Sequence, residues 1–279
     1  MTVYKLTMSY DGAGFSGFQR QSDEDLLTVQ GLLEATFSEL FGERVKLHGA
    51  GRTDAGVHAR AQIAHVCSGR TIPPERLRYA LNRALPPSLV ITDVSVVDAG
   101  FHARKCAIGK WYSYRIYNAQ TPPALGHGYF THIPQPLDRE LFEEALACYL
   151  GHHDFEGFCG RGATVQTFDR TLYLAKCCVD RCDPAWWQVH FVGDGFLRKM
   201  VRNLIGTAVD IALGRRPLSA IERALTSGDR SQAGPTAAAC GLTMEEVFYE
   251  EATLAERLAQ LERLPDDRVA PLLADPLMI

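Results

Sequence analysis

The stretch that most constrains this chain is a glycine-rich string at residues 48–62, of sequence HGAGRTDAGVHARAQ. It lies between residues 45–47 (VKL) and 63–66 (IAHV), which are mostly apolar, so the pattern predicts a strand, a tight loop and a second strand. Glycines at this density permit positive φ and close backbone approach. The loop's one carboxylate, Asp54, lies between Arg52 and Arg60, and such a loop can present a charged side chain with little freedom. Asp and Gly are also ordinary turn formers, so a hairpin with a turn-capping Asp54 and solvated arginines is the alternative.

The composition is that of a folded globular protein. The chain has 279 residues, of which 46% are hydrophobic and 22% charged, enough for one large or two modest domains. The apolar runs fall far short of the roughly 18 residues that cross a membrane. The N-terminal residues lack the layout of a signal peptide. These features predict a cytoplasmic protein that does not enter a membrane.

Eight cysteines raise the question of disulfides or zinc. A long chain without a signal peptide argues against a disulfide framework. His152, His153 and Cys159 lie near further cysteines in sequence, but C-x-x-C pairs are missing. Adjacent Cys177 and Cys178 would point to opposite faces of a strand. We therefore expect no metal site, and we expect most thiols to act as small apolar residues.

The formal charge of −4 argues at first against a nucleic-acid partner, but its distribution removes the objection. Residues 1–104 hold eleven basic and eleven acidic side chains, and residues 105–249 hold fifteen of each. Residues 250–279 hold three basic and seven acidic side chains, so the whole deficit lies in this tail. A neutral body can still gather Arg and Lys on one face, as phosphate binding requires.

Periodicity predicts alternating strands and helices. In residues 1–104 we expect strands at 4–10 and 89–97, and helices at 28–41 and from 73 to Pro86. Residues 105–249 follow a similar plan, with strands at 110–117, 171–179 and 186–192 and helices at 139–150 and from 195. A last helix is expected at 250–263, followed by a short apolar end. The sequence thus predicts an α+β fold with halves 1–104 and 105–249 and an acidic helical tail at 250–279.

Other segments also carry potential chemistry. Residues 11–21 (DGAGFSGFQRQ) form a glycine-rich loop that does not fit a P-loop, because Gly-Lys-Ser/Thr does not follow. In the strand at 110–117, alternation places Tyr112 and Tyr114 on one face, although such aromatic stripes usually belong to the core. Residues 195–206 (GFLRKMVRNLIG) place four cationic or amide side chains near a helix start. That arrangement suits anion contact, or is simply a solvated helix end.

These strings, in this order, resemble the motifs of the tRNA pseudouridine synthase A family. The loop at 51–62 resembles its catalytic motif, and residues 10–21 resemble its Y-D-G-x-x-F-x-G-W-Q-x-Q opening. Phe18 replaces the usual Trp, which keeps an aromatic surface and removes an N–H donor. Further resemblances are F-H-A-R at 101–104, K-x-Y-x-Y at 110–114, G-x-H-D-F at 151–155, M-V-R-N at 200–203 and the closing G-L strand at 241–242. The resemblance covers about residues 4–250.

The resemblance implies a pseudouridine synthase fold, with two similar halves of mainly antiparallel sheet meeting at a central RNA-binding cleft. It implies isomerisation of uridine to pseudouridine in the anticodon stem-loop of tRNA, around uridines 38 to 40, by a homodimer without a cofactor. It gives the catalytic role to Asp54, whose attack on ribose or on uracil stays open. Residues expected to bind the substrate are Tyr112 as the active-site ring, Arg202 as the partner of the catalytic Asp, Arg52 as the filler of the flipped-base gap, Leu242 in the uracil pocket, and Arg104 near the RNA.

Two other classes of function remain as alternatives. A non-catalytic RNA-binding module would use aromatic strands in the RRM manner, but the RNP1 signature is missing and Asp54 would have no role. A metal-dependent deaminase or nuclease would need ligand spacing that the sequence lacks. The pseudouridine synthase interpretation accounts for the most motifs.

Overall fold

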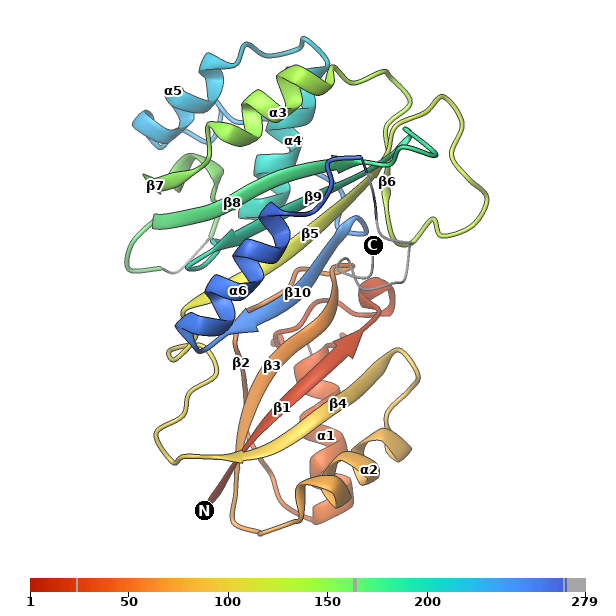
Figure 1. Ribbon diagram of the computed structural model, residues 1–279. Coiled ribbons are helices and arrows are strands. Elements are labelled where there is room, and N and C mark those ends of the chain that lie inside the picture. Colours follow the sequence, from red (N-terminus) through yellow and green to blue (C-terminus); the bar gives the residue numbers. More distant parts are fainter. Residues whose placement is uncertain (24, 163–164, 268, 270–279) are drawn as a thin grey trace. The chain divides into compact units, whose positions relative to one another are not determined.

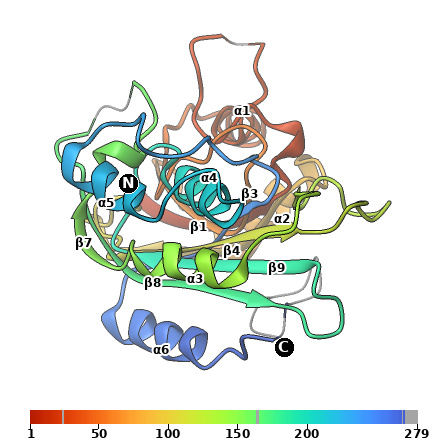
Figure 2. The same ribbon diagram turned by 90° about the horizontal axis from the view of Figure 1, so that it is seen from above.

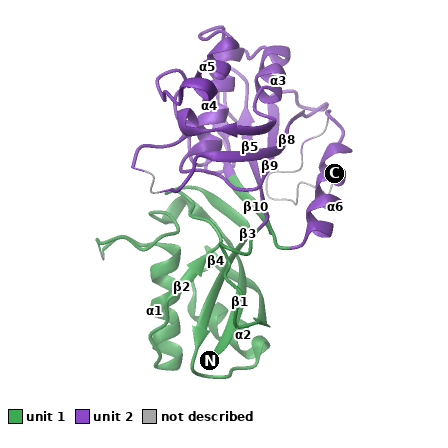
Figure 3. Ribbon diagram, turned by 90° about the vertical axis from the view of Figure 1, so that its left-hand side faces the viewer, with its two compact units in different colours: residues 1–107, 243–249 green, residues 108–242, 250–279 purple. Residues whose placement is uncertain are grey.

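The computed structural model describes residues 1–23, 25–162, 165–267 and 269. The chain divides into two compact units (Figure 3). Unit 1 comprises residues 1–107 and 243–249, and unit 2 comprises residues 108–242 and 250–279. The sequence-based division at 104 and 249 stays a prediction. The apolar end expected after residue 268 lies almost wholly outside the described residues.

Unit 1 is built on the strand order β4-β1-β3-β10 (Figure 1). β1 (Thr2–Tyr10) pairs antiparallel with β3 (His58–Ser68) and with β4 (Leu89–Val97), whereas β10 (Leu242–Phe248) runs parallel to β3. The short β2 (Leu47–Gly49) adds to β3 in antiparallel register. The 48–62 string therefore runs from β2 through a loop into β3, which confirms the predicted strand, loop and strand.

Two helices pack against this sheet. In β1, Tyr4, Leu6 and Met8 alternate with half-exposed residues and are fully buried. α1 (Val29–Phe41) starts where Thr28 accepts a hydrogen bond from the Gly31 backbone N–H (3.1 Å). α2 (Pro74–Ala84) begins with proline, whose missing N–H is not needed in a first turn. α1 and α2 contact one another, and a 3-10 turn, η1 (Gly12–Gly14), follows β1.

Unit 2 has the strand order β5-β9-β8-β7, with neighbours antiparallel. These strands are β5 (Gly109–Tyr117), β7 (Gly151–Asp154), β8 (Asp169–Val179) and β9 (Trp186–Gly193). The short β6 (Thr131–His132) pairs parallel with β5. Because both units combine mainly antiparallel strands with helices, the predicted α+β class is confirmed.

Helices cover both faces of the unit 2 strands (Figure 2). On one face lie α3 (Arg139–Ala147) and α4 (Met200–Ala212), with α5 (Ser219–Ser227) and η2 (Glu156–Phe158) beyond them. The predicted tail helix, α6 (Glu251–Glu262), packs on the other face. Lys176 of β8 donates to the Leu264 carbonyl (2.6 Å) and pairs with Asp266 (2.9 Å). The acidic tail is thus partly paired with a cation of the sheet.

Several expectations need correction. α3 ends at Ala147 and not near residue 150, because Gly151 adopts φ +96°, a conformation suited to glycine, and β7 begins there. α4 begins at Met200 and not at 195, because Lys199 at φ +59° interrupts the helical path. α5, β6 and β7 were not predicted. Only three of the eight cysteines (Cys159, Cys177 and Cys178) are buried, so most are not core residues.

The described part of the chain lacks two kinds of feature. None of its helices is long and apolar enough to cross a membrane. Its His, Cys, Asp and Glu side chains form no group of three or more that could hold a metal ion.

Candidate active site

Asp54 lies in the loop between β2 and β3. The loop is closed where the Ala50 N–H donates to the Ile63 carbonyl (2.7 Å) and where the Val57 N–H donates to the Asp54 carbonyl (3.1 Å). Gly56 takes φ +79° inside this turn, a conformation that other residues adopt only with strain. The Asp54 side chain is half-buried, so a carboxylate is held at the surface on a fixed backbone.

A buried hydrogen-bond network supports the loop from the sheet. The Tyr10 hydroxyl lies 2.8 Å from the Thr53 hydroxyl, and Gln62 Nε2 donates to the Gly51 carbonyl (3.0 Å) and to the Tyr10 oxygen (3.4 Å). Burial raises the pKa of Tyr10 to about 12, so its phenol stays protonated near neutral pH. The residue before Asp54 is therefore tied to β1, and the start of the loop is tied to β3.

The glycine-rich segment after β1 packs directly on the same loop. The Phe18 N–H donates to the Thr53 carbonyl (3.0 Å). Gly17 has φ +96°, and a Cβ there would lie 2.9 Å from that same carbonyl oxygen. A Cβ on Gly12 would overlap the carbonyl of Val57. Both glycines thus permit a backbone approach that larger residues would prevent, and the two motifs form one packed structure.

The arginines around Asp54 have different surroundings. Arg52 is exposed, and its Nε donates to Gln19 Oε1 (3.1 Å). Arg60 lies in β3 and forms an ion pair with the buried carboxylate of Glu245 in β10 (3.0 Å). The hairpin alternative, with both arginines solvated, is wrong for Arg60. Gln19, which binds Arg52, also lines a polar cavity of about 510 Å³ together with Lys46 and other residues.

The predicted residues of unit 2 lie on β5, on α4 and at the start of β10. Tyr112 is 6% exposed, and its ring meets the Phe196 ring edge-on at 5.1 Å. Tyr114 is fully buried, and its hydroxyl donates to the Ala238 carbonyl (2.9 Å). Burial raises the pKa of Tyr114 above the ordinary value of a phenol. Tyr114 is thus fixed in the core, whereas Tyr112 packs on a residue of the segment before α4. Leu242 is also buried, at 6% exposure.

Arg202 lies in the first turn of α4. Its Nε donates to the Ala237 carbonyl (2.7 Å), and the Ala237 N–H donates to the Arg202 carbonyl (3.0 Å). Asn203 is fully buried and donates to the Phe158 carbonyl (2.7 Å). The expected contact of four polar side chains with an anion therefore does not hold for Asn203, which binds protein backbone.

The structure assigns the six predicted site residues to two sets. Asp54, Arg52 and the exposed Arg104 belong to unit 1. Tyr112, Arg202 and Leu242 belong to unit 2.

A family model described as tRNA pseudouridine synthase matches residues 6–104 and 145–250. The chain belongs to the tRNA pseudouridine synthase family. The family assignment confirms the predicted pseudouridine synthase fold. Its members isomerise uridine to pseudouridine in tRNA, so the chain is an isomerase and the non-catalytic alternative is excluded.

Individual relatives agree with the family assignment. The chain is 41% identical to a tRNA pseudouridine synthase A of Brevibacillus brevis, over 89% of this chain and all of the relative. It is 39% identical to that of Lactobacillus delbrueckii subsp. bulgaricus, over 91% of this chain and 97% of the relative. Among solved structures, a chain of a Cbf5-Nop10-Gar1 complex matches with a TM-score of 0.35 and 9% identity, covering 91% of this chain and 63% of that chain.

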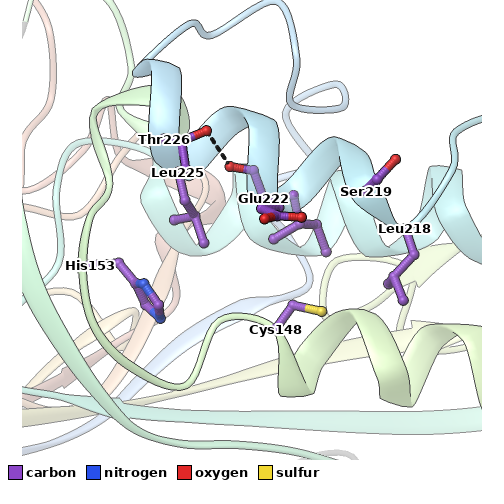
Figure 4. Close-up of a pocket in the computed structure, with 8 residues that line it drawn as sticks. Cys148, His153, Leu218, Ser219, Glu222, Leu225 and Thr226 are labelled. Atoms are coloured by element: carbon purple, nitrogen blue, oxygen red, sulfur yellow. Dashed lines mark hydrogen bonds between the residues drawn. The ribbon is translucent and has the colours of Figure 1, made fainter.

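A cavity in unit 2 is lined by none of the six predicted site residues. It measures about 600 Å³ and lies between the end of α3 and α5 (Figure 4). Leu218, Ile221 and Leu225 line it together with Cys148 and His153. Because the lining is mostly apolar and includes none of the six predicted residues, we do not assign the reaction to it.

The sequence did not reveal which residues support the loop that carries Asp54. Tyr10 and Gln62 hold it as described, and His58 Nδ1 accepts from the Gly12 N–H (3.0 Å) and lies 3.1 Å from Asp11 Oδ1. These residues fall inside or beside the two motifs, which was the available signal. Their pairing became visible only with the β1–β3 register, which places Tyr10 opposite Ala59.

Proposed function

We propose that this synthase acts on the anticodon stem-loop of tRNA, around uridines 38 to 40, and that Asp54 is its catalytic residue. The observation that carries the proposal is the loop itself. The family's catalytic motif folds into a turn that is fixed from β1, from β3 and from the glycine-rich segment, with the Asp54 carboxylate half-buried on it. Such rigidity suits a nucleophile that must meet one atom of a substrate.

The chemistry requires little more than this carboxylate. The base leaves the ribose as the C1′–N1 bond breaks, turns, and returns as a C1′–C5 bond forms. The C5 proton is lost and N1 gains a proton, so uridine and pseudouridine are isomers and no electrons are exchanged. A carboxylate can form a covalent intermediate in such a reaction, by attack on the ribose or on the uracil ring. The proposal therefore includes no cofactor.

Arg52 is proposed to fill the space that the target base leaves. The base must first leave its stack, which costs a few kcal/mol. Arg52 lies two residues before Asp54, and its hydrogen bond to Gln19 limits the freedom of its exposed side chain. A guanidinium held in this way can stack on bases and contact phosphates.

The residues of unit 2 are proposed to act on the same uridine. Tyr112 would stack on the flipped ring or take the C5 proton, Arg202 would keep Asp54 ionised by a charge-assisted contact, and Leu242 would line the uracil pocket. Support comes from the match of each residue to a family motif. It also comes from the first turn of α4, where backbone contacts with Ala237 limit the freedom of Arg202.

The remaining proposals concern the substrate and the assembly. We propose that Arg104 contacts the RNA backbone, that the enzyme works in the cytoplasm as a homodimer, and that one tRNA touches both subunits. We also propose that residues 1–104 and 105–249 are related halves followed by a tail. The family resemblance supports these points.

A tritium-release assay tests the proposal. tRNA labelled at C5 of uridine should release tritium when the protein is added, and a chelator should not reduce the rate. Pseudouridine mapping of the same tRNA should place the products around positions 38 to 40. Tritium release with products elsewhere would overturn the choice of stem-loop, and a lack of release would overturn the proposed reaction.

A further inference from the structure

Residues 101–105 of unit 1 form a turn that presents Arg104, and two distant side chains fix its backbone. The Ala103 N–H donates to Nδ1 of His65 in β3 (3.1 Å). The Tyr249 hydroxyl, which follows β10, donates to the Ala103 carbonyl (2.8 Å). Ala103 is fully buried and His65 is 5% exposed. Both polar backbone groups of a single residue are therefore held by side chains, one buried (His65) and one half-buried (Tyr249).

Ring contacts complete the support of this turn. Phe101 packs against His65 (ring centroids 6.1 Å apart) and against Tyr249 (5.2 Å). The His102 ring lies 4.7 Å from the His65 ring, and its Nδ1 accepts from the Arg104 N–H (3.2 Å). The backbone at Arg104 is thus fixed, whereas its side chain is exposed.

His65 can accept this hydrogen bond only if Nδ1 carries no proton. Burial, and then the neighbouring imidazoles of His102 and His48, lower the pKa of His65 to about 4. Lys46 and Arg104 add positive charge around His48, and Glu34 opposes it. At neutral pH His65 is therefore an uncharged acceptor. An apolar residue would bury more apolar surface without a polar group to satisfy, so an imidazole here is explained by the bond that it accepts.

We propose that His65 is a positioning residue for RNA binding, which acts through the Ala103 backbone to hold Arg104 against a phosphate of the substrate. The inference rests on the proposed function, because it takes Arg104 as an RNA contact. A long cationic side chain loses conformational freedom when it binds. A backbone that is already fixed adds no loss of its own, and the chain fixes it with two polar side chains, the buried His65 and the half-buried Tyr249.

A matched pair of substitutions tests the acceptor. His65→Asn places an oxygen near the position of Nδ1, whereas His65→Gln moves the polar group away from it. We expect His65→Gln to weaken tRNA binding about as much as Arg104→Ala, by about 3- to 10-fold. Each lost phosphate contact should lower the slope of log Kd against log salt by about 0.9. His65→Asn should bind nearly as the wild type does.

The double variant decides whether His65 acts through Arg104. His65→Gln should add little to the loss in the Arg104→Ala background, because the contact is already absent. Tyr249→Phe, which removes the other hydrogen bond without leaving a cavity, should behave like His65→Gln. The exposed Tyr79→Phe is its matched control, and melting temperatures are recorded for each variant.

Three results would overturn the inference: additive losses, equal binding by the Asn and Gln variants, or wild-type binding by His65→Gln. Tritium release by the wild type is measured in parallel. Its absence would count against the proposed reaction, whereas the Kd values judge His65 separately.

Discussion

The hydrogen bond between Tyr10 and Thr53 should control both stability and the placement of Asp54. Tyr10→Phe removes one hydroxyl and leaves the Thr53 hydroxyl buried without that partner, since Thr53 is only 7% exposed. Leaving a buried polar group unsatisfied costs about 1–3 kcal/mol, so we expect the free energy of unfolding to fall by that amount. Thr53→Val should cost a similar amount, because it removes the shorter of the two hydrogen bonds of the buried Tyr10 hydroxyl and leaves only the one from Gln62.

The double variant separates this hydrogen bond from simple loss of packing. With both hydroxyls removed, no stranded partner remains in this pair, and we expect part of the stability to return. Urea unfolding measures the stabilities, and single-turnover tritium release at saturating tRNA measures the effect on Asp54. A loss of about 1.4 kcal/mol in transition-state positioning corresponds to a tenfold lower rate. Strictly additive losses, or single variants within about 0.5 kcal/mol of wild type, the range of a neutral surface substitution, would refute the reasoning.

Three further predictions concern a glycine in α4, two buried histidines and Tyr112. Gly206→Ala should lower the free energy of unfolding, measured with urea, by about 3 kcal/mol or more, because the new Cβ would overlap the Pro235 carbonyl and the backbone there cannot easily move. An unchanged urea midpoint would contradict this. Burial lowers the pKa of His65 to about 4 and of His190 to about 3, below the ordinary 6.5. As the pH falls, these histidines therefore take up protons in the unfolded chain before they do so in the folded protein. Their contribution to the free energy of unfolding should be complete above pH 6.5 and should fall towards pH 4. A flat profile of stability between pH 7 and 5 would be inconsistent with buried neutral imidazoles. Tyr112→Phe should lower turnover about 10²- to 10⁴-fold with unchanged tRNA affinity and melting temperature, as for a lost acid or base; near-normal turnover would limit Tyr112 to stacking.

Local patterns were sufficient to predict most elements of the fold. Alternation located β1 and β5, helical spacing located α1, and proline signals located α2, because these depend on neighbours in the chain. The end of α3 and the start of α4 were missed because they depend on the backbone conformations of Gly151 and Lys199. Helix α5 was missed altogether.

Only those parts of the candidate site that lie within a single sequence motif could be predicted. The string around Asp54 predicted the strand, loop and strand at residues 48–62, but the hydrogen bond between Tyr10 and this loop depends on the pairing of β1 with β3, about 50 residues later. Arg60 was taken as a possible solvated charge, and its partner Glu245 lies in β10, far along the chain. Such contacts follow from strand order, which local sequence does not contain.

The most direct test of the account is single-turnover tritium release by Asp54→Asn. The substitution removes the charge of the carboxylate and almost no volume. The variant should therefore fold as the wild type does, and its tRNA affinity should stay within a few-fold of the wild-type value. Asp93→Asn, at an exposed position on β4 of the same unit, is the matched control. We predict that the control releases tritium at the wild-type rate, and that Asp54→Asn releases it at less than about a hundredth of that rate, as expected for a lost nucleophile. A folded Asp54→Asn variant that binds tRNA and retains more than that hundredth would contradict covalent catalysis by Asp54.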